Sequence, residues 1–328
     1  MRSMSRRAAL ALPLGAALPL VARADDWKPN QPVRLLVASA PGGTTDIMAR
    51  LLSPRLQSRW GTSVVAENRA GAGGTICTLE MVRARPDGST IMSGNIGPQA
   101  IAYSLFRNLP YRPEQVLAIA GTITGPNVLV VNNDVPARSV AELAALIRAR
   151  PGQVSYASTG VGQSTHLSPV LMLQMLNAEA IHVPFRGSGP AQVDLLAANV
   201  NFLIDNLTGV IEQIRSGRVR ALAVTSRERS PQLPNVPAMR ETMPELASYE
   251  VNTWFGIFGP AGLPNATVQA INAEVNAWLD LPDTRRRFTD LGGEPLKLSP
   301  EAFADFVVAE TRKWAGVVRR EGIQVEAG

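Results

Sequence analysis

Cysteine and histidine are scarce in this sequence, and their scarcity excludes several kinds of site. Cys77 is the only cysteine, so no internal disulfide can form and no thiol-based metal or redox site can be assembled. His166 and His182 are the only histidines, which argues against a zinc or iron site built from imidazoles. We expect a chain held together by its hydrophobic core, without metal or cofactor, whose polar chemistry rests on hydroxyls, backbone amides and carboxylates.

The first residues have the pattern of a secretory signal peptide. Three arginines within the first seven residues precede an apolar run from Ala8 to Val21, and Ala22-Arg23-Ala24 then supplies the small-x-small pattern that signal peptidase accepts. The run is too short to span a bilayer and contains two prolines and a glycine, which favours a cleaved signal over a membrane anchor. We therefore predict a signal peptide over residues 1–24, cleaved after Ala24, and a periplasmic mature protein.

The basic excess of the chain comes mainly from this segment. The full sequence has 32 Lys and Arg against 27 Asp and Glu, a formal net charge of +5. Loss of Arg2, Arg6, Arg7 and Arg23 with the signal leaves 28 basic against 27 acidic side chains. The mature chain thus has no charge surplus that would attract nucleic acid or an anionic membrane, and we expect neither as a partner.

The remaining sequence contains no internal repeat and alternates short apolar runs with amphipathic segments. This alternation predicts an α/β fold with largely parallel sheets and crossover helices. The predicted strands cover residues 33–37, 63–65, 90–92, 116–120, 128–131, 154–157, 181–183, 202–204 and 220–224, and the predicted helices cover residues 47–60, 74–85, 140–150, 167–176, 266–279 and 300–321.

A mature chain of about 300 residues is longer than one core usually fills, so two lobes are expected. Two extended segments, residues 125–128 and 249–260, suit chain crossings between them. Lobe 1 would then be discontinuous, formed by residues 25–127 plus 252–328, and lobe 2 would comprise residues 128–251. The helices near the C-terminus would pack back on lobe 1.

A glycine-rich turn after the first predicted strand is the leading candidate for a ligand site. Gly42 and Gly43 let the backbone turn sharply and approach a ligand closely, and Thr44, Thr45 and Asp46 are residue types that begin helices. Free N–H groups and two hydroxyls would lie at the positive end of a helix, which favours an anion. Asp46 carries the wrong charge to touch an anion and is expected to cap the turn or bond a neighbouring loop.

A second candidate loop follows the strand that ends at residue 157. Ser158, Thr159 and the amides from Gly160 onward could hold the other end of a ligand. Ser164 or Ser158 together with His166 also raises the alternative of a secreted serine hydrolase. The sequence lacks the G-x-S-x-G nucleophile elbow, and no third member of a triad can be assigned, so we expect no catalytic residue and no enzyme.

A strand end and another glycine-rich loop are further candidates for ligand contacts. Asp205 ends a predicted strand and could bond an amino or hydroxyl group of a ligand, or equally a loop amide. The loop from Asn68 to Thr75 superficially suggests a dinucleotide fingerprint, but Ile76 replaces its third glycine. Its glycines are better explained by close helix packing at the rim of a cleft.

Taken in order along the chain, these motifs resemble the substrate-binding proteins of tripartite tricarboxylate transporters, also called the Bug family of extracytoplasmic receptors. The similarity extends over essentially the whole mature chain. The matching segments are residues 41–46, 67–75, 86–88, 156–162 with 166–167, 182–187, 220–226, 229–237 and 254–264.

The resemblance implies a type II periplasmic binding-protein fold, with two lobes, each a mostly parallel sheet flanked by helices, and a ligand cleft between them. It implies that a carboxylate is held by the loop at Gly42, Gly43, Thr44 and Thr45 on one side and by Ser158, Thr159 and Gly160 on the other. Family ligands are mostly di- and tricarboxylates, with some acidic amino acids, aromatic acids and amides. The implied role is delivery of such a ligand to membrane permease subunits, by a protein expected to be a monomer. A receptor subunit that reports ligand occupancy to a membrane sensor kinase is the alternative.

Overall fold

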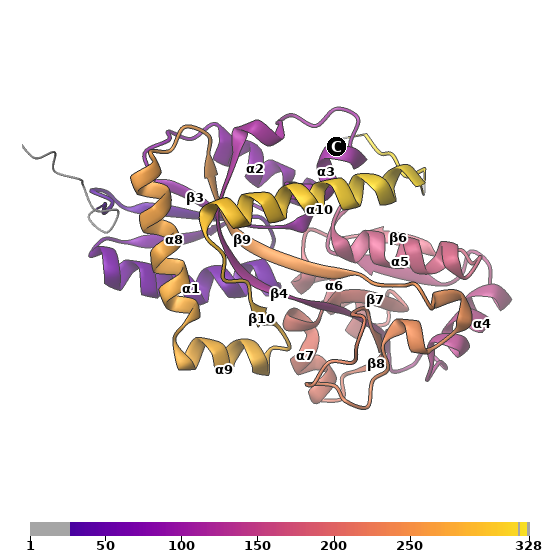
Figure 1. Ribbon diagram of the computed structural model, residues 1–328. Helices are drawn as coiled ribbons and strands as arrows, with labels where there is room; N and C mark the ends of the chain where they lie inside the picture. Colours follow the sequence, from indigo (N-terminus) through magenta and orange to yellow (C-terminus); the bar gives the residue numbers. More distant parts are fainter. Residues whose placement is uncertain (1–26, 321, 327–328) are drawn as a thin grey trace, which may run out of the picture.

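The computed structural model describes residues 27–320 and 322–326 (Figure 1). The predicted signal peptide and its cleavage site after Ala24 lie outside these residues and stay a prediction. No helix in the described part of the chain combines the length and the apolar character needed to cross a bilayer.

The first part of the chain forms three parallel strands separated by helices. These are β1 (Val33–Val37), α1 (Thr44–Trp60), β2 (Val64–Asn68), α2 (Thr75–Val82) and β3 (Thr90–Asn95), and β1 pairs in parallel with both β2 and β3. Strand β1 is apolar on both faces because helices cover both faces of the sheet: Leu36 belongs to one core cluster, whereas Leu35 and Val37 belong to the other. We call this part, with its flanking helices, the β1 half.

The middle of the chain repeats this plan. Strands β5 (Ser155–Ser158), β6 (Ile181–Pro184) and β7 (Phe202–Asn206) are parallel, with β5 in the centre, and helices α5 (Ser164–Met175), α6 (Ser188–Leu196) and α7 (Leu207–Arg215) follow the three strands in turn. Strand β8 (Val219–Val224) joins by antiparallel pairing with β4. We call this part the β5 half.

Two long strands, β4 (Val116–Asn132) and β9 (Asn252–Pro260), connect the halves (Figure 1). The N-terminal part of β4 pairs with β9, and its C-terminal part pairs with β7 and β8, all antiparallel. The prediction of two separate strands at 116–120 and 128–131 is therefore wrong. Register shifts against β9 between Ala118 and Ala120 and between Gly121 and Thr124 let one strand continue through the whole segment.

The remaining elements complete both halves. They are α3 (Ala102–Leu105), α4 (Val140–Ala149), α8 (Asn265–Leu279), α9 (Pro282–Asp290), β10 (Glu294–Pro295) and α10 (Pro300–Arg320). Helices α8 and α10 return to the β1 half: Asn272 donates a 2.8 Å hydrogen bond to the Ile119 carbonyl, and the Phe303 ring lies 5.5 Å from that of Phe258. In Figure 1, α10 crosses above the strands that connect the halves.

Candidate ligand-binding site

A small polar cavity lies where the β1 half meets the β5 half. Every residue that lines it ends or follows a strand at its carboxyl edge, or begins the next helix, which is where open parallel sheets bind ligands. The lining residues are Ala38, Ser39, Gly43, Thr44, Thr45, Asn95, Thr159, Gln163, Gly187, Ser188 and Asn206. The cavity measures about 20 Å³, little more than the space one water molecule needs.

Four helices begin at this cavity, one from the β1 half and three from the β5 half. Their N-cap residues are Gly43 for α1, Gln163 for α5, Gly187 for α6 and Asn206 for α7. None of the four helices receives a side-chain hydrogen bond from its N-cap residue. In α4, by contrast, the Ser139 hydroxyl accepts a 3.1 Å hydrogen bond from the Glu142 amide. The first turns of the four helices therefore direct partial positive charge at one point, as anion sites do.

The hydroxyls on the α1 side are free to donate into the cavity. The Thr44 Oγ1 atom is buried and has no hydrogen-bond partner. The Thr45 Oγ1 atom accepts a 3.1 Å hydrogen bond from Asn95 Nδ2, which leaves its own hydrogen for another acceptor. An unpaired buried hydroxyl costs free energy, and Thr44 lines the cavity, so its hydroxyl is available to an acceptor placed there.

No cationic side chain lines the cavity among the described residues. Arg186 is exposed, and Arg69 is bound by Glu67 and Glu80 on the outer surface of the β1 half. Nor do the described residues contain a cluster of His, Cys, Asp and Glu that could hold a metal ion. An anion here would be held by helix termini and neutral donors.

Asp46 stabilises the glycine-rich turn from behind, as predicted. Its carboxylate accepts hydrogen bonds from the Gly42 amide at 3.1 Å, from Asn68 Nδ2 at 2.9 Å and from Arg50 Nε at 3.0 Å. Burial alone would raise the pKa of Asp46, but the hydrogen bonds from Arg50, Asn68 and Gly42 hold it below its ordinary value. The carboxylate is thus committed to the turn and to α1.

Asp205 lies behind the cavity wall and does not line it. It is fully buried and accepts hydrogen bonds from the Ser188 hydroxyl, from Gln192 Nε2 at 2.9 Å and from the Asn206 amide at 2.8 Å. Burial raises the pKa of Asp205, and these three donors act against that rise. Asp205 was expected to bond either a ligand or a loop amide, and the geometry supports bonds to neighbouring protein groups. One of these bonds orients Ser188, which lines the cavity.

The second predicted loop contributes two residues, Thr159 and Gln163, to the cavity wall. Ser158 is fully buried, and its Oγ lies 2.7 Å from His182 Nε2. The Gly160 amide donates a 3.3 Å hydrogen bond back to Ser158 Oγ. Of the eight predicted ligand residues, Gly43, Thr44, Thr45 and Thr159 line the cavity, and Gly42, Ser158, Gly160 and Asp205 do not.

The geometry around His166 does not suit a hydrolase. The His166 ring stacks on the His182 ring, with centroids 4.4 Å apart, and its Nδ1 accepts a 3.4 Å hydrogen bond from the Gly162 amide. Burial, with a smaller effect of the neighbouring imidazole of His182, lowers the pKa of His166 to about 3. The histidine that contacts Ser158 is His182, on the adjacent strand.

Sequence reasoning missed seven lining residues: Ala38, Ser39, Asn95, Gln163, Gly187, Ser188 and Asn206. Each had a local signal, because each ends or follows a strand, or precedes or begins a helix, at the same edge of the sheet as Thr44. Which of the strand ends meet depends on strand order, and the sequence pattern does not define that order.

Comparison with known proteins gives consistent matches. A family model described as the tripartite tricarboxylate transporter family receptor matches residues 48–323. An R. palustris protein in a structure with adipate is 33% identical, with a TM-score of 0.87 over 91% of this chain and 99% of that one. The periplasmic binding protein BugD is 34% identical, with a TM-score of 0.86 over 90% and 99%. MatC from Rhodopseudomonas palustris, with bound malate, is 33% identical, with a TM-score of 0.84 over 88% and 99%.

Proposed function

Because this chain belongs to the tripartite tricarboxylate transporter receptor family, we propose that its cavity captures a small organic carboxylate for uptake across a membrane. The chain has the α/β periplasmic binding-protein fold and is a solute-binding receptor, not an enzyme. The hydrolase alternative is thereby corrected.

The convergence of four uncapped helix N-termini on one neutral, hydroxyl-lined cavity is the observation that carries this proposal. A carboxylate there would accept from the Thr44 and Thr45 hydroxyls and from backbone N–H groups of the first helical turns. Binding without an arginine clamp relies on dipoles that are already oriented, so little reorganisation is needed when the anion arrives. The relatives with adipate and malate make an aliphatic dicarboxylate the first class to test.

Capture requires the two halves to move. A cavity of about 20 Å³ does not admit a dicarboxylate, so the β1 and β5 halves must separate to take up the ligand and close around it afterwards. The strands β4 and β9, which connect the halves, are the natural hinge. We assign residues 25–127 with 252–328 to one lobe and residues 128–251 to the other.

The partners follow from the family. A receptor of a tripartite transporter works with membrane components, and we propose that the permease subunits recognise the closed, ligand-loaded form of this chain as a monomer. Export to the periplasm through the segment that precedes Ala24 belongs to the same proposal.

The test is thermal unfolding of the mature chain, residues 25–328, with adipate, malate and citrate. Adipamide, which has the length of adipate without its charge, serves as the matched control. A ligand present at 100 times its Kd should stabilise the protein by about 2.7 kcal/mol, seen as a rise in Tm. Equal effects of adipate and adipamide, or no rise with any carboxylate, would exclude an anion site.

A further inference from the structure

Two hydrogen bonds join the halves at the rim of the cavity. The Gln163 Nε2 atom of the β5 half donates a 2.7 Å hydrogen bond to the Gly73 carbonyl of the β1 half. Nearby, the Ala40 amide of the β1 half donates a 3.0 Å hydrogen bond to the Arg186 carbonyl of the β5 half. Gln163 is 6% exposed and also lines the cavity, so it belongs to the contact between the halves and to the ligand site at once.

Glycines make room for this contact on the side of the β1 half. A Cβ atom added at Gly73 would lie 2.1 Å from the Val161 carbonyl oxygen, so the loop must have glycine there for the halves to meet. A Cβ added at Gly97 would lie 2.7 Å from three atoms of the Gln163 amide group. The backbone of Gly97 does not have a positive φ, so its conformation does not require glycine. The Gln163 amide that lies against Gly97 instead explains why this position has no side chain.

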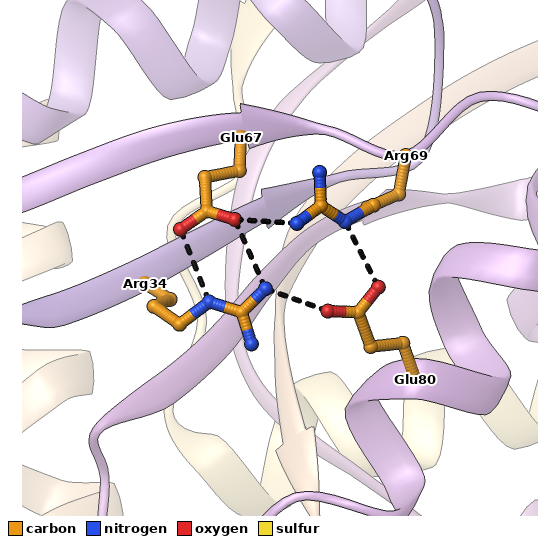
Figure 2. A network of polar contacts seen from close by, with 4 residues as sticks. All are labelled: Arg34, Glu67, Arg69 and Glu80. Atoms are coloured by element: carbon orange, nitrogen blue, oxygen red, sulfur yellow. Dashed lines mark hydrogen bonds and ion pairs between the residues drawn. The ribbon is translucent and has the colours of Figure 1, made fainter.

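The loop that carries Gly73 is held rigidly at its base. Arg34 and Arg69 alternate with Glu67 and Glu80 in a closed ring of ion pairs, with the N–O distances between 2.6 and 3.0 Å (Figure 2). Arg69 begins the loop, and Glu80 lies on α2, which follows it. The ring fixes both ends of the segment from Arg69 to Thr75, so the Gly73 carbonyl is presented at a defined position when the β5 half approaches.

We propose that Gln163 is the positioning residue that couples ligand occupancy to closure, by bridging from the ligand cavity to the Gly73 carbonyl. The inference rests on the proposed function, since it assumes that closure retains a ligand. As the halves separate, water hydrates the Gln163 amide and the Gly73 carbonyl. As they close, both groups lose this water and must bond each other. A ligand anion at the N-terminus of α5 lies beside Gln163, its N-cap residue, and so favours the geometry in which this bond forms.

The experiment measures the closed fraction directly. Ser58→Cys and Ala145→Cys place labels on exposed positions of the two halves, and the native Cys77 is buried and does not compete for label. The distance between labels is recorded with and without adipate for the wild-type background, for Gln163→Glu and for Gln163→Ala. Gln163→Glu keeps the shape but replaces the donor with an acceptor. We expect both variants to lower the closed-to-open ratio about three- to tenfold.

Gly97→Ala supplies an independent arm, because Gly97 itself does not line the cavity. The added methyl should displace the Gln163 amide and reduce closure in the wild-type background, but should have no effect when Gln163→Ala has already removed that amide. A closed fraction in Gln163→Glu equal to that of wild type, or an equal effect of Gly97→Ala in both backgrounds, would overturn the inference. If one variant fails to fold, as judged by its Tm, the closed fractions of the other two still test the inference.

The two proposals fail in different ways. If adipate and the other carboxylates change no distance in any variant, while closure of the free protein still depends on Gln163, the ligand class is wrong and the bridge stands. If carboxylates close the wild-type protein and every Gln163 variant to the same degree, the site is right and the bridge is wrong.

Discussion

The Ser158 hydroxyl contacts the Nε2 atom of His182 at 2.7 Å, and His182 lies on the strand parallel to that of Ser158. The His182 ring is also stacked between Tyr156 and His166, with centroid distances of 4.9 and 4.4 Å. This stack fills the interior behind the second ligand loop. Ser158 thus supports the loop from inside, through a neutral imidazole.

The buried histidines predict that stability falls on acidification. Burial lowers the pKa of His166 to about 3 and that of His182 to about 4, whereas both titrate near 6.5 when unfolded. Between about pH 6.5 and pH 4 the unfolded chain therefore binds more protons, and stability is lost as pH falls through this window. Unfolding followed from pH 7.5 to pH 4 should show a loss of several kcal/mol, to which each histidine contributes up to about 3 kcal/mol.

The control for this pH dependence is the double variant His166→Gln with His182→Gln. Its stability should depend less steeply on pH than that of wild type. Asp205, whose pKa is raised by burial, has the opposite dependence, but it is present in both proteins and cancels in the difference. Parallel curves for the two proteins would contradict the assignment to the histidines.

Thr44→Val should separate ligand binding from stability. Valine keeps the shape of threonine and removes the unpaired Oγ1, so the free protein should be as stable as wild type or gain about 1 kcal/mol. Affinity for a carboxylate such as adipate should fall about tenfold, because one donor is lost. Calorimetric titration and thermal unfolding measure the two quantities.

Thr122→Val is the matched control for Thr44→Val. The Thr122 Oγ1 atom is also buried without a partner, but Thr122 lies in β4 and does not line the cavity. It should change stability in the same direction and leave affinity unchanged. Equal affinities for wild type and Thr44→Val would show that this hydroxyl does not contact the ligand.

Asp205→Asn should destabilise the fold and weaken binding indirectly. Three donors meet the Asp205 carboxylate, and an asparagine there has one acceptor oxygen and turns an NH₂ group toward the others. We expect a loss of about 2 kcal/mol in the free energy of unfolding and a lower affinity, as Ser188 loses its orientation. Asp134→Asn, at an exposed position of the same half, should stay within about 0.5 kcal/mol of wild type. Similar losses in both variants would contradict the role given to Asp205.

Asp46→Ala should lower both stability and affinity, because the turn that carries Gly43, Thr44 and Thr45 loses its internal acceptor. A loss of about 1 to 2 kcal/mol is expected, typical of a removed cap. Arg50→Ala removes the half-exposed ion pair together with the exposed hydrogen bond from Arg50 to Asn68 Oδ1, and should cost less than about 1 kcal/mol. If the two variants are equal in stability and affinity, the ion pair and not the bond to the Gly42 amide is the stabilising contact.

Local features of the site could be predicted, and non-local ones could not. The turn at residues 42–46 is decided within a few residues: glycines permit the bend, threonines begin the helix and Asp46 bonds the Gly42 amide. Ser158 was expected to face the ligand because it follows a strand. Side chains alternate between the two faces of a strand, and only the pairing with β6 brings His182 beside it. The contacts of Asp205 could not be predicted for the same reason, because Ser188 and Gln192, which donate to this strand residue, lie on α6.

The sequence by itself determined the α/β alternation, the helix start at Thr44 and, through its ordered motifs, the family, whereas the signal peptide stays a prediction. Each of these depends on residues close together in the chain or on the order of short segments. The tertiary structure alone decided that β4 runs unbroken between the halves, that four helix starts share one cavity and that Gln163 meets Gly73. Those relationships depend on strand order, register and the packing of segments as far apart in the chain as Gly43 and Asn206, which local patterns do not encode.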